Sequence, residues 1–303
     1  MEVVMTFRIN RRQFITTPYL LTAFPALWLG AQDEKDERRI RKIKFSLNAY
    51  SFNRPLRDGA MTIDDLLEFC FQYNLDALDL TAYYFPGYPA IPPDRLIFDI
   101  KRKAFLNGLE ISGTGIRNDF TEPDPDKRNA DIILIRNWIA CAAKLGAPVI
   151  RVFAGKQSPE EFTREQIITW LVKELRICSD YGSRFGIVVA IQNHNDFIRN
   201  AEDVLEILKM VNSDWFGLVL DIGSFRSGDP YEQIARLAHH AVSWQIKENV
   251  YINGVEQKVD LKIISEILKE SGYRGYIPIE TLGEGDPRQK VIRFLDEVRS
   301  TLG

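Results

Sequence analysis

The chain has 303 residues, of which 45% are apolar and 27% charged, as in ordinary globular proteins. Its net charge of −3 argues against a nucleic-acid partner, because binding a phosphate backbone needs an excess of Lys and Arg. Its three cysteines show no CxxC spacing, which argues against a disulfide framework or a zinc finger.

Residues 1–31 are predicted to be an export signal rather than part of the fold. Arg11 and Arg12 precede an apolar run, and small residues then precede the charged segment DEKDERRIRK. This order is typical of a signal peptide, and the paired arginines are typical of the twin-arginine type. We expect a periplasmic protein with cleavage near Ala31, or a cytoplasmic one if the signal does not function. The run is too short for a membrane span, so no anchor is expected after cleavage, and residues 32–43 form a charged linker. The alternative is an apolar arm that packs on the folded domain.

From residue 43 onward, short apolar segments alternate with amphipathic helical patterns. Eight segments are predicted strands: 44–52, 75–83, 109–116, 147–155, 187–194, 216–223, 240–248 and 275–283. Helix start signals stand at Thr62, Thr163 and Asn200, each followed three residues later by Asp or Gln, as in a capping box. Strands that alternate with helices pair in parallel, so residues 44–303 are predicted to form an α/β single domain, a (β/α)8 TIM barrel. A doubly wound sheet is the alternative, but SLNAYSFNRP lacks the glycine-rich loop that such a sheet usually shows.

Polar side chains gather at the carboxyl ends of the last four predicted strands, where such a barrel carries its active site. They are Gln192 and His194, Asp221, Gln245 and Lys247, and Glu280. Residues two apart on a strand share a face, so His194 is expected above Gln192 and Lys247 above Gln245. Oxygen-bearing side chains at one level suit a hard divalent cation such as Mg²⁺ or Mn²⁺. The structural alternatives are a hydrogen-bonded polar layer for Gln192, a cap on the following loop for Asp221, an ion pair with Lys247 or Arg151 for Glu280, a loop contact for His194 and a carboxylate partner for Lys247.

Other residues near the strand ends are candidates for substrate binding. The segment TAYYFPGYP contains Tyr83 and Tyr84, whose aromatic faces stack well on sugar C–H surfaces. Arg151 and Lys156 flank the end of the fourth strand, and Arg226 follows the sixth. We expect these three to contact anionic or hydroxyl groups of a carbohydrate. For the tyrosines, the alternative is an aromatic lid that packs on its own barrel.

The segments IVVAIQNHND, GLVLDIG, VSWQIKEN and YIPIETLGEGDP resemble strands five to eight of the xylose isomerase-like TIM barrels. This group is also called sugar phosphate isomerases/epimerases, or AP endonuclease family 2. The resemblance implies one divalent metal held by Glu, Asp, His or Gln, and Glu, at positions that match Gln192, Asp221, Gln245 and Glu280. It also implies that the two glutamates move a proton next to a carbonyl.

Two residues depart from the family pattern. Gln192 replaces a glutamate, and its amide can ligate a metal but cannot act as a general base. Ser224 stands where many relatives have a histidine. Glu280, His194 and Lys247 therefore remain as the candidate catalytic residues.

The strand ends and the resemblance together predict a carbohydrate isomerase or epimerase that depends on one divalent metal, Mn²⁺ or Mg²⁺. The metal polarises a carbonyl, a base removes the neighbouring proton, and a metal-bound enediolate forms. Because Gln192 removes one base, a lyase that acts on keto-sugars or 3-keto-glycosides by β-elimination is the alternative. A non-catalytic sugar-binding barrel is the alternative of another class, and three histidines are too few for a multi-zinc endonuclease. Neither the sugar nor the oligomeric state follows from the sequence.

Overall fold

The computed structural model describes residues 43–156 and 160–303 of the chain. The predicted export signal and, apart from Ile43, the predicted charged linker lie outside the described residues. Within the described ranges, no helix has both the length and the apolar character that crossing a membrane requires.

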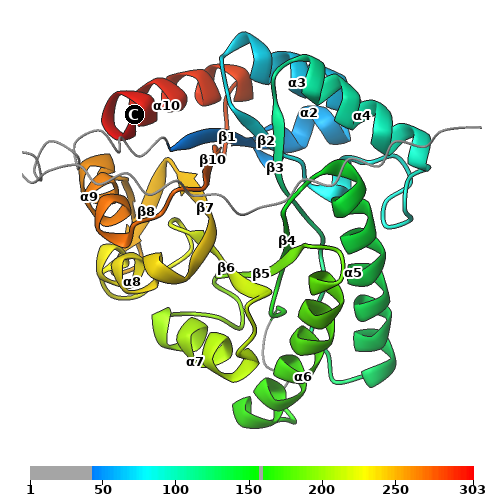
Figure 1. Ribbon diagram of the computed structural model, residues 1–303. Coiled ribbons are helices and arrows are strands. Elements are labelled where there is room, and N and C mark those ends of the chain that lie inside the picture. The colour runs from blue at the N-terminus through cyan, green and yellow to red at the C-terminus, as the bar shows by residue number, and fades with distance from the viewer. Residues whose placement is uncertain (1–42, 157–159) are drawn as a thin grey trace, which may run out of the picture. The chain divides into compact units, whose positions relative to one another are not determined.

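Eight parallel strands close into a barrel in the order β1–β10–β7–β6–β5–β4–β3–β2 (Figure 1). They are β1 (Lys44–Asn48), β2 (Ala77–Asp79), β3 (Glu110–Gly115), β4 (Val149–Val152), β5 (Val188–Gln192), β6 (Phe216–Asp221), β7 (Ala241–Lys247) and β10 (Tyr276–Glu280). Each lies within one of the eight predicted segments. The predicted (β/α)8 barrel is therefore confirmed.

Helices surround the strands of the barrel (Figure 1). They are α2 (Asn53–Arg57), α3 (Ile63–Gln72), α4 (Asp94–Leu106), α5 (Pro125–Leu145), α6 (Arg164–Ser183), α7 (Ala201–Val211), α8 (Pro230–Leu237), α9 (Leu261–Ser271) and α10 (Pro287–Leu302), with the short 3-10 helices η1 (Ala49–Phe52), η2 (Ala82–Tyr84) and η3 (Ala238–His240). Capping boxes begin α3, α6 and α7 at Thr62, Thr163 and Asn200, as predicted. In each box a side-chain oxygen accepts a backbone N–H that has no partner within the helix.

The inward face of the barrel changes from apolar to polar along the strands. Val149, Ala190 and Val219 form a small apolar cluster of their own. Since side chains two apart share a face, the next inward residues on β4, β5 and β6 are Arg151, Gln192 and Asp221. Strand alternation therefore places a polar layer directly above an apolar floor, at the carboxyl end of the barrel.

A two-stranded hairpin between β7 and α9 was not predicted. Its strands, β8 (Asn249–Ile252) and β9 (Val255–Lys258), pair antiparallel. The turn residues Asn253 and Gly254 both have positive φ, 50° and 81°, which the tight turn of a two-residue hairpin requires. The Asn-Gly pair in YINGVEQK is the sequence signal for this turn, and the hairpin adds a wall to the mouth of the barrel.

Candidate active site

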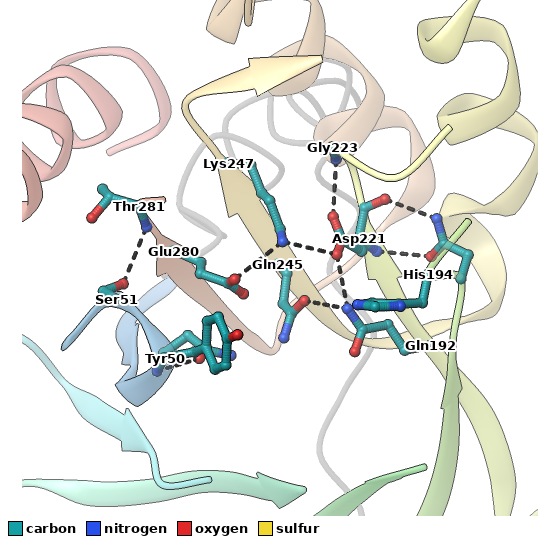
Figure 2. Close-up of polar contacts among 12 residues, drawn as sticks. Tyr50, Ser51, Gln192, His194, Asp221, Gly223, Gln245, Lys247, Glu280 and Thr281 are labelled. Atoms are coloured by element: carbon teal, nitrogen blue, oxygen red, sulfur yellow. Dashed lines mark hydrogen bonds and ion pairs between the residues drawn. The ribbon is translucent and has the colours of Figure 1, made fainter. Parts of the chain in front are cut away.

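The strand ends of β5, β6, β7 and β10 form one buried polar cluster (Figure 2). Its members are Gln192, Asp221, Gln245, Lys247 and Glu280. Strand register explains the convergence, because Asp221 pairs with Gln245 in one ladder and Glu280 with Lys247 in the next. The structure thus brings together every residue predicted for the metal-binding layer.

Lys247 lies between the two carboxylates of this cluster. Its Nζ is 3.1 Å from Oδ2 of Asp221 and 3.1 Å from Oε1 of Glu280. Burial works against the ammonium, but the two carboxylates outweigh it and raise the pKa of Lys247 above its usual value. Lys247 is therefore a fixed positive charge at neutral pH, and it cannot serve as a base.

Gln192 donates both of its cluster hydrogen bonds through Nε2. The acceptors are Oδ2 of Asp221 at 2.8 Å and Oε1 of Gln245 at 2.7 Å. Because a carboxylate can only accept, the contact with Asp221 decides which end of the amide faces it. The other oxygen of Asp221 accepts the backbone N–H of Gly223 at 3.0 Å. Both oxygens of Asp221 therefore face N–H donors.

Asn193 explains why amides crowd the end of β5. Its Nδ2 donates to the backbone oxygen of Asp221 at 2.8 Å, and its Oδ1 accepts the backbone N–H of Asp221 at 2.9 Å. The side chain thus takes the place of a strand partner just above the last β5–β6 pair. Asn193 positions Asp221, while Gln192 hydrogen-bonds its carboxylate.

The predicted divalent-metal site fits these side chains poorly. The cluster holds two carboxylates, and Lys247 is paired with both. Gln192 presents N–H groups to the layer, and an N–H donor cannot coordinate a cation. Across residues 43–156 and 160–303, no three His, Cys, Asp or Glu side chains form a group able to hold a metal ion. Binding of Mn²⁺ or Mg²⁺ stays a prediction from the sequence.

A cavity of about 400 Å³ borders the cluster. Lys247 and Glu280 line it together with His194, Ser224 and Arg226. The side chain of His194 is 44% exposed, and its ring packs edge-on against another aromatic ring 4.8 Å away. The guanidinium of Arg226 lies 3.4 Å from the ring centroid of a tyrosine on the hairpin. His194 and Arg226 therefore line the cavity, where they can contact a bound ligand.

The predicted aromatic platform borders a second cavity, of about 340 Å³. Tyr83 lines it, and its hydroxyl accepts a hydrogen bond from the buried guanidinium of Arg151 at 3.0 Å. Tyr84 lines neither this cavity nor the first, and its hydroxyl donates to Asn53 at 3.0 Å. Lys156 is exposed and lines neither of the two cavities. Of these predicted residues, Tyr83 therefore lines this cavity, and Arg151 lies buried behind it as a hydrogen-bond partner.

Sequence reasoning missed Asp79, at the end of β2. Its Oδ2 accepts a hydrogen bond from Asn48 at 3.2 Å, and its carboxyl group lies against Gly113 on β3. Burial raises the pKa of Asp79 to about 6, with smaller opposing effects of Arg151, which lowers it, and Glu280, which raises it. A carboxyl group with this pKa exchanges protons near neutral pH. In the sequence Asp79 lies in the middle of the predicted strand 75–83, and it is at a strand end only because β2 stops at Asp79.

Comparison with known proteins assigns the chain to a family with the same fold. A family model described as a xylose isomerase-like TIM barrel matches residues 59–298. No curated protein matches the chain.

Several solved structures share the fold. A D-psicose 3-epimerase from Clostridium cellulolyticum H10, solved with D-tagatose, is 16% identical with a TM-score of 0.71, over 86% of this chain and 99% of that chain. The IOLI protein, solved with a zinc atom, is 17% identical with a TM-score of 0.69, over 86% and 98%. A 3-keto-D-glucoside 4-epimerase from E. coli is 14% identical with a TM-score of 0.67, over 86% and 100%. At such identities the likeness establishes the fold.

Proposed function

The chain belongs to the xylose isomerase-like TIM-barrel family, and from this premise we propose that it is a carbohydrate isomerase or epimerase. The observation that carries the proposal is the contact of Glu280 with Lys247, a carboxylate beside a fixed positive charge on the edge of a cavity. Moving a proton next to a carbonyl needs both groups, because negative charge passes from the base to the carbonyl oxygen. The names of similar solved structures support a small carbohydrate as the substrate.

In the proposed reaction Glu280 takes the proton from the carbon next to the carbonyl. The C–H electron pair forms the C=C bond of an enediolate, and the carbonyl π pair moves to oxygen. The ammonium of Lys247 donates a hydrogen bond to that oxygen. Return of the proton to the former carbonyl carbon gives the isomer, with the hydroxyl proton of the enediolate passing from one oxygen to the other. Return to the opposite face of the carbon that lost the proton gives the epimer.

Epimerisation needs a second proton donor, which Gln192 cannot provide. Asp79 is the candidate, because its raised pKa keeps part of the carboxyl group protonated near neutral pH. The predicted dependence on Mn²⁺ or Mg²⁺ is not required by any of these steps.

A lyase is the second candidate, and the amide at Gln192 favours it. If the proton does not return to carbon, the C=C pair of the enediolate can form a new double bond to the β-carbon while the carbonyl is restored. The substituent then leaves the β-carbon with its bonding pair and takes up the proton held by Glu280. The same Glu280 and Lys247 would serve both reactions, so the products distinguish them.

Deuterium incorporation tests the proposal. The protein is incubated in D₂O with ketoses, 3-keto-glucosides and other keto-sugars, and C–H signals are followed by NMR. We expect one C–H signal of one substrate to disappear with wild type and to persist with Glu280→Gln. Glu202→Gln, the same change at an exposed helix residue paired with Arg236, is the matched control and should exchange like wild type. Absence of exchange on every sugar by folded protein would favour a non-catalytic sugar-binding barrel.

A further inference from the structure

We infer that Lys247 takes the place of a divalent cation in this site, so that the polar cluster binds no divalent metal. The ammonium of Lys247 then supplies the positive charge that faces the sugar carbonyl. Only this second statement rests on the proposed function, whereas the absence of a metal concerns the cluster alone.

The position of β7 makes the substitution possible. This strand lies between β6 and β10 in the barrel, so Lys247 extends from the middle strand toward a carboxylate on each neighbour. The side chains of Lys247, Asp221 and Glu280 are 13%, 0% and 6% exposed. Figure 2 shows Nζ between the two carboxylates, and it is 3.1 Å from each. A metal ion that used these two carboxylates would have to displace the ammonium from a buried position.

The amide of Gln192 blocks the remaining oxygen atoms that could coordinate a metal ion. Its Nε2 donates to Asp221 and to Gln245, so it occupies the oxygens that a metal ion would need from both residues. Rotation of the amide would point its oxygen at the carboxylate of Asp221 and bring two acceptors together. The layer is therefore satisfied by hydrogen bonds within the protein.

The charges favour the same conclusion. Two carboxylates and one ammonium leave the cluster with a single negative charge. A divalent ion added beside Lys247 would place two cations next to each other in a buried site, where their repulsion is poorly screened.

Among the described residues, the ammonium also keeps a third N–H for a ligand. It carries three N–H groups, and the contacts with Asp221 and Glu280 use two of them. Lys247 lines the cavity of about 400 Å³, so the third can reach a ligand oxygen there.

Titration of Mn²⁺ into the full-length protein, after treatment with a chelator, tests the inference without any substrate. Free Mn²⁺ is followed by electron paramagnetic resonance. Wild type is expected to bind no Mn²⁺ at micromolar concentrations. The double variant Gln192→Glu/Lys247→Met adds a carboxylate and removes the competing cation, so it should bind Mn²⁺ at least about 100-fold more tightly than wild type. Lys258→Met, at an exposed lysine paired with Glu297, is the matched control and should behave like wild type.

One Mn²⁺ bound by wild type with a micromolar Kd would overturn the inference, whatever the activity. If circular dichroism shows that the double variant is unfolded, the wild-type titration still decides. Deuterium exchange that proceeds in excess chelator would support both the inference and the proposed function, whereas exchange that requires Mn²⁺ would overturn the inference alone. If wild type shows no metal binding and no deuterium exchange, the metal-free cluster is supported and the proposed function is refuted.

Discussion

Replacing Asp79 with asparagine is expected to stabilise the protein at pH 8. Burial raises the pKa of Asp79 to about 6 in the folded protein, from 3.8 for an ordinary aspartate. A difference of about 2 pKa units corresponds to about 3 kcal/mol, at roughly 1.36 kcal/mol per unit. Since Asp79 keeps some contact with solvent, this value is the upper limit of the gain.

The pH dependence has a definite sign. Between pH values of about 4 and 6 the folded state retains a proton that the unfolded state has released. The free energy of unfolding therefore falls as the pH rises through this window, and it levels off above the folded pKa. Asparagine has no proton to lose, so the advantage of Asp79→Asn should be absent below about pH 4 and complete above about pH 7.

Urea denaturation of both proteins from pH 4 to pH 8 measures this advantage. Asp58→Asn, at an exposed aspartate beside Arg54, is the control and should show no comparable rise with pH. If Asp79 returns the proton, the variant should also lose formation of the epimer while it retains deuterium exchange. The reasoning would be refuted if wild type and Asp79→Asn had equal free energies of unfolding at pH 8, or if the difference between them narrowed as the pH rises.

Three further predictions concern other parts of the chain. In urea denaturation, Arg128→Met should lower the free energy of unfolding by about 3 to 5 kcal/mol, because it removes the partner of the buried Glu174 at 2.6 Å. The double variant with Glu174→Leu should recover much of this loss. Gly254→Ala should lower the free energy of unfolding by about 1 kcal/mol, since φ is 81° there; an unchanged urea midpoint would contradict a strained turn. Replacing Arg11 and Arg12 with lysine should retain the protein in the cytoplasm, and recovery of the variant from the periplasm at the wild-type level in cell fractionation would argue against a twin-arginine signal.

The barrel could be predicted because its signals are local. Each strand is a short apolar segment, and each capping box, such as Thr62 with Asp65, lies within four residues. The hairpin carried an equally local signal, Asn253-Gly254, and a search for turn dipeptides would have found it. The polar layer also followed from the sequence, because side-chain alternation assigns a face to every residue at a strand end.

The electrostatics of the layer could not be predicted, because they depend on contacts between strands. Whether Lys247 would pair with a glutamate or act alone was open in the sequence, and register decides it by setting Lys247 opposite Glu280. The raised pKa of Asp79 likewise arises from burial by segments distant in the sequence. Such effects require the closed barrel, not only its strands.

The neutral amide of Gln192 and the ammonium of Lys247 together set the charge of the polar layer. A glutamate at position 192 would place three carboxylates around a single ammonium, and the excess of negative charge would favour either a protonated carboxyl group or an added cation. Glutamine removes that charge, yet its Nε2 still hydrogen-bonds Asp221 and Gln245. The amide therefore suits a layer whose cation is the ammonium of Lys247. The replacement of glutamate by glutamine at position 192 removes a base from the site, and it also removes the excess negative charge that a metal ion would balance.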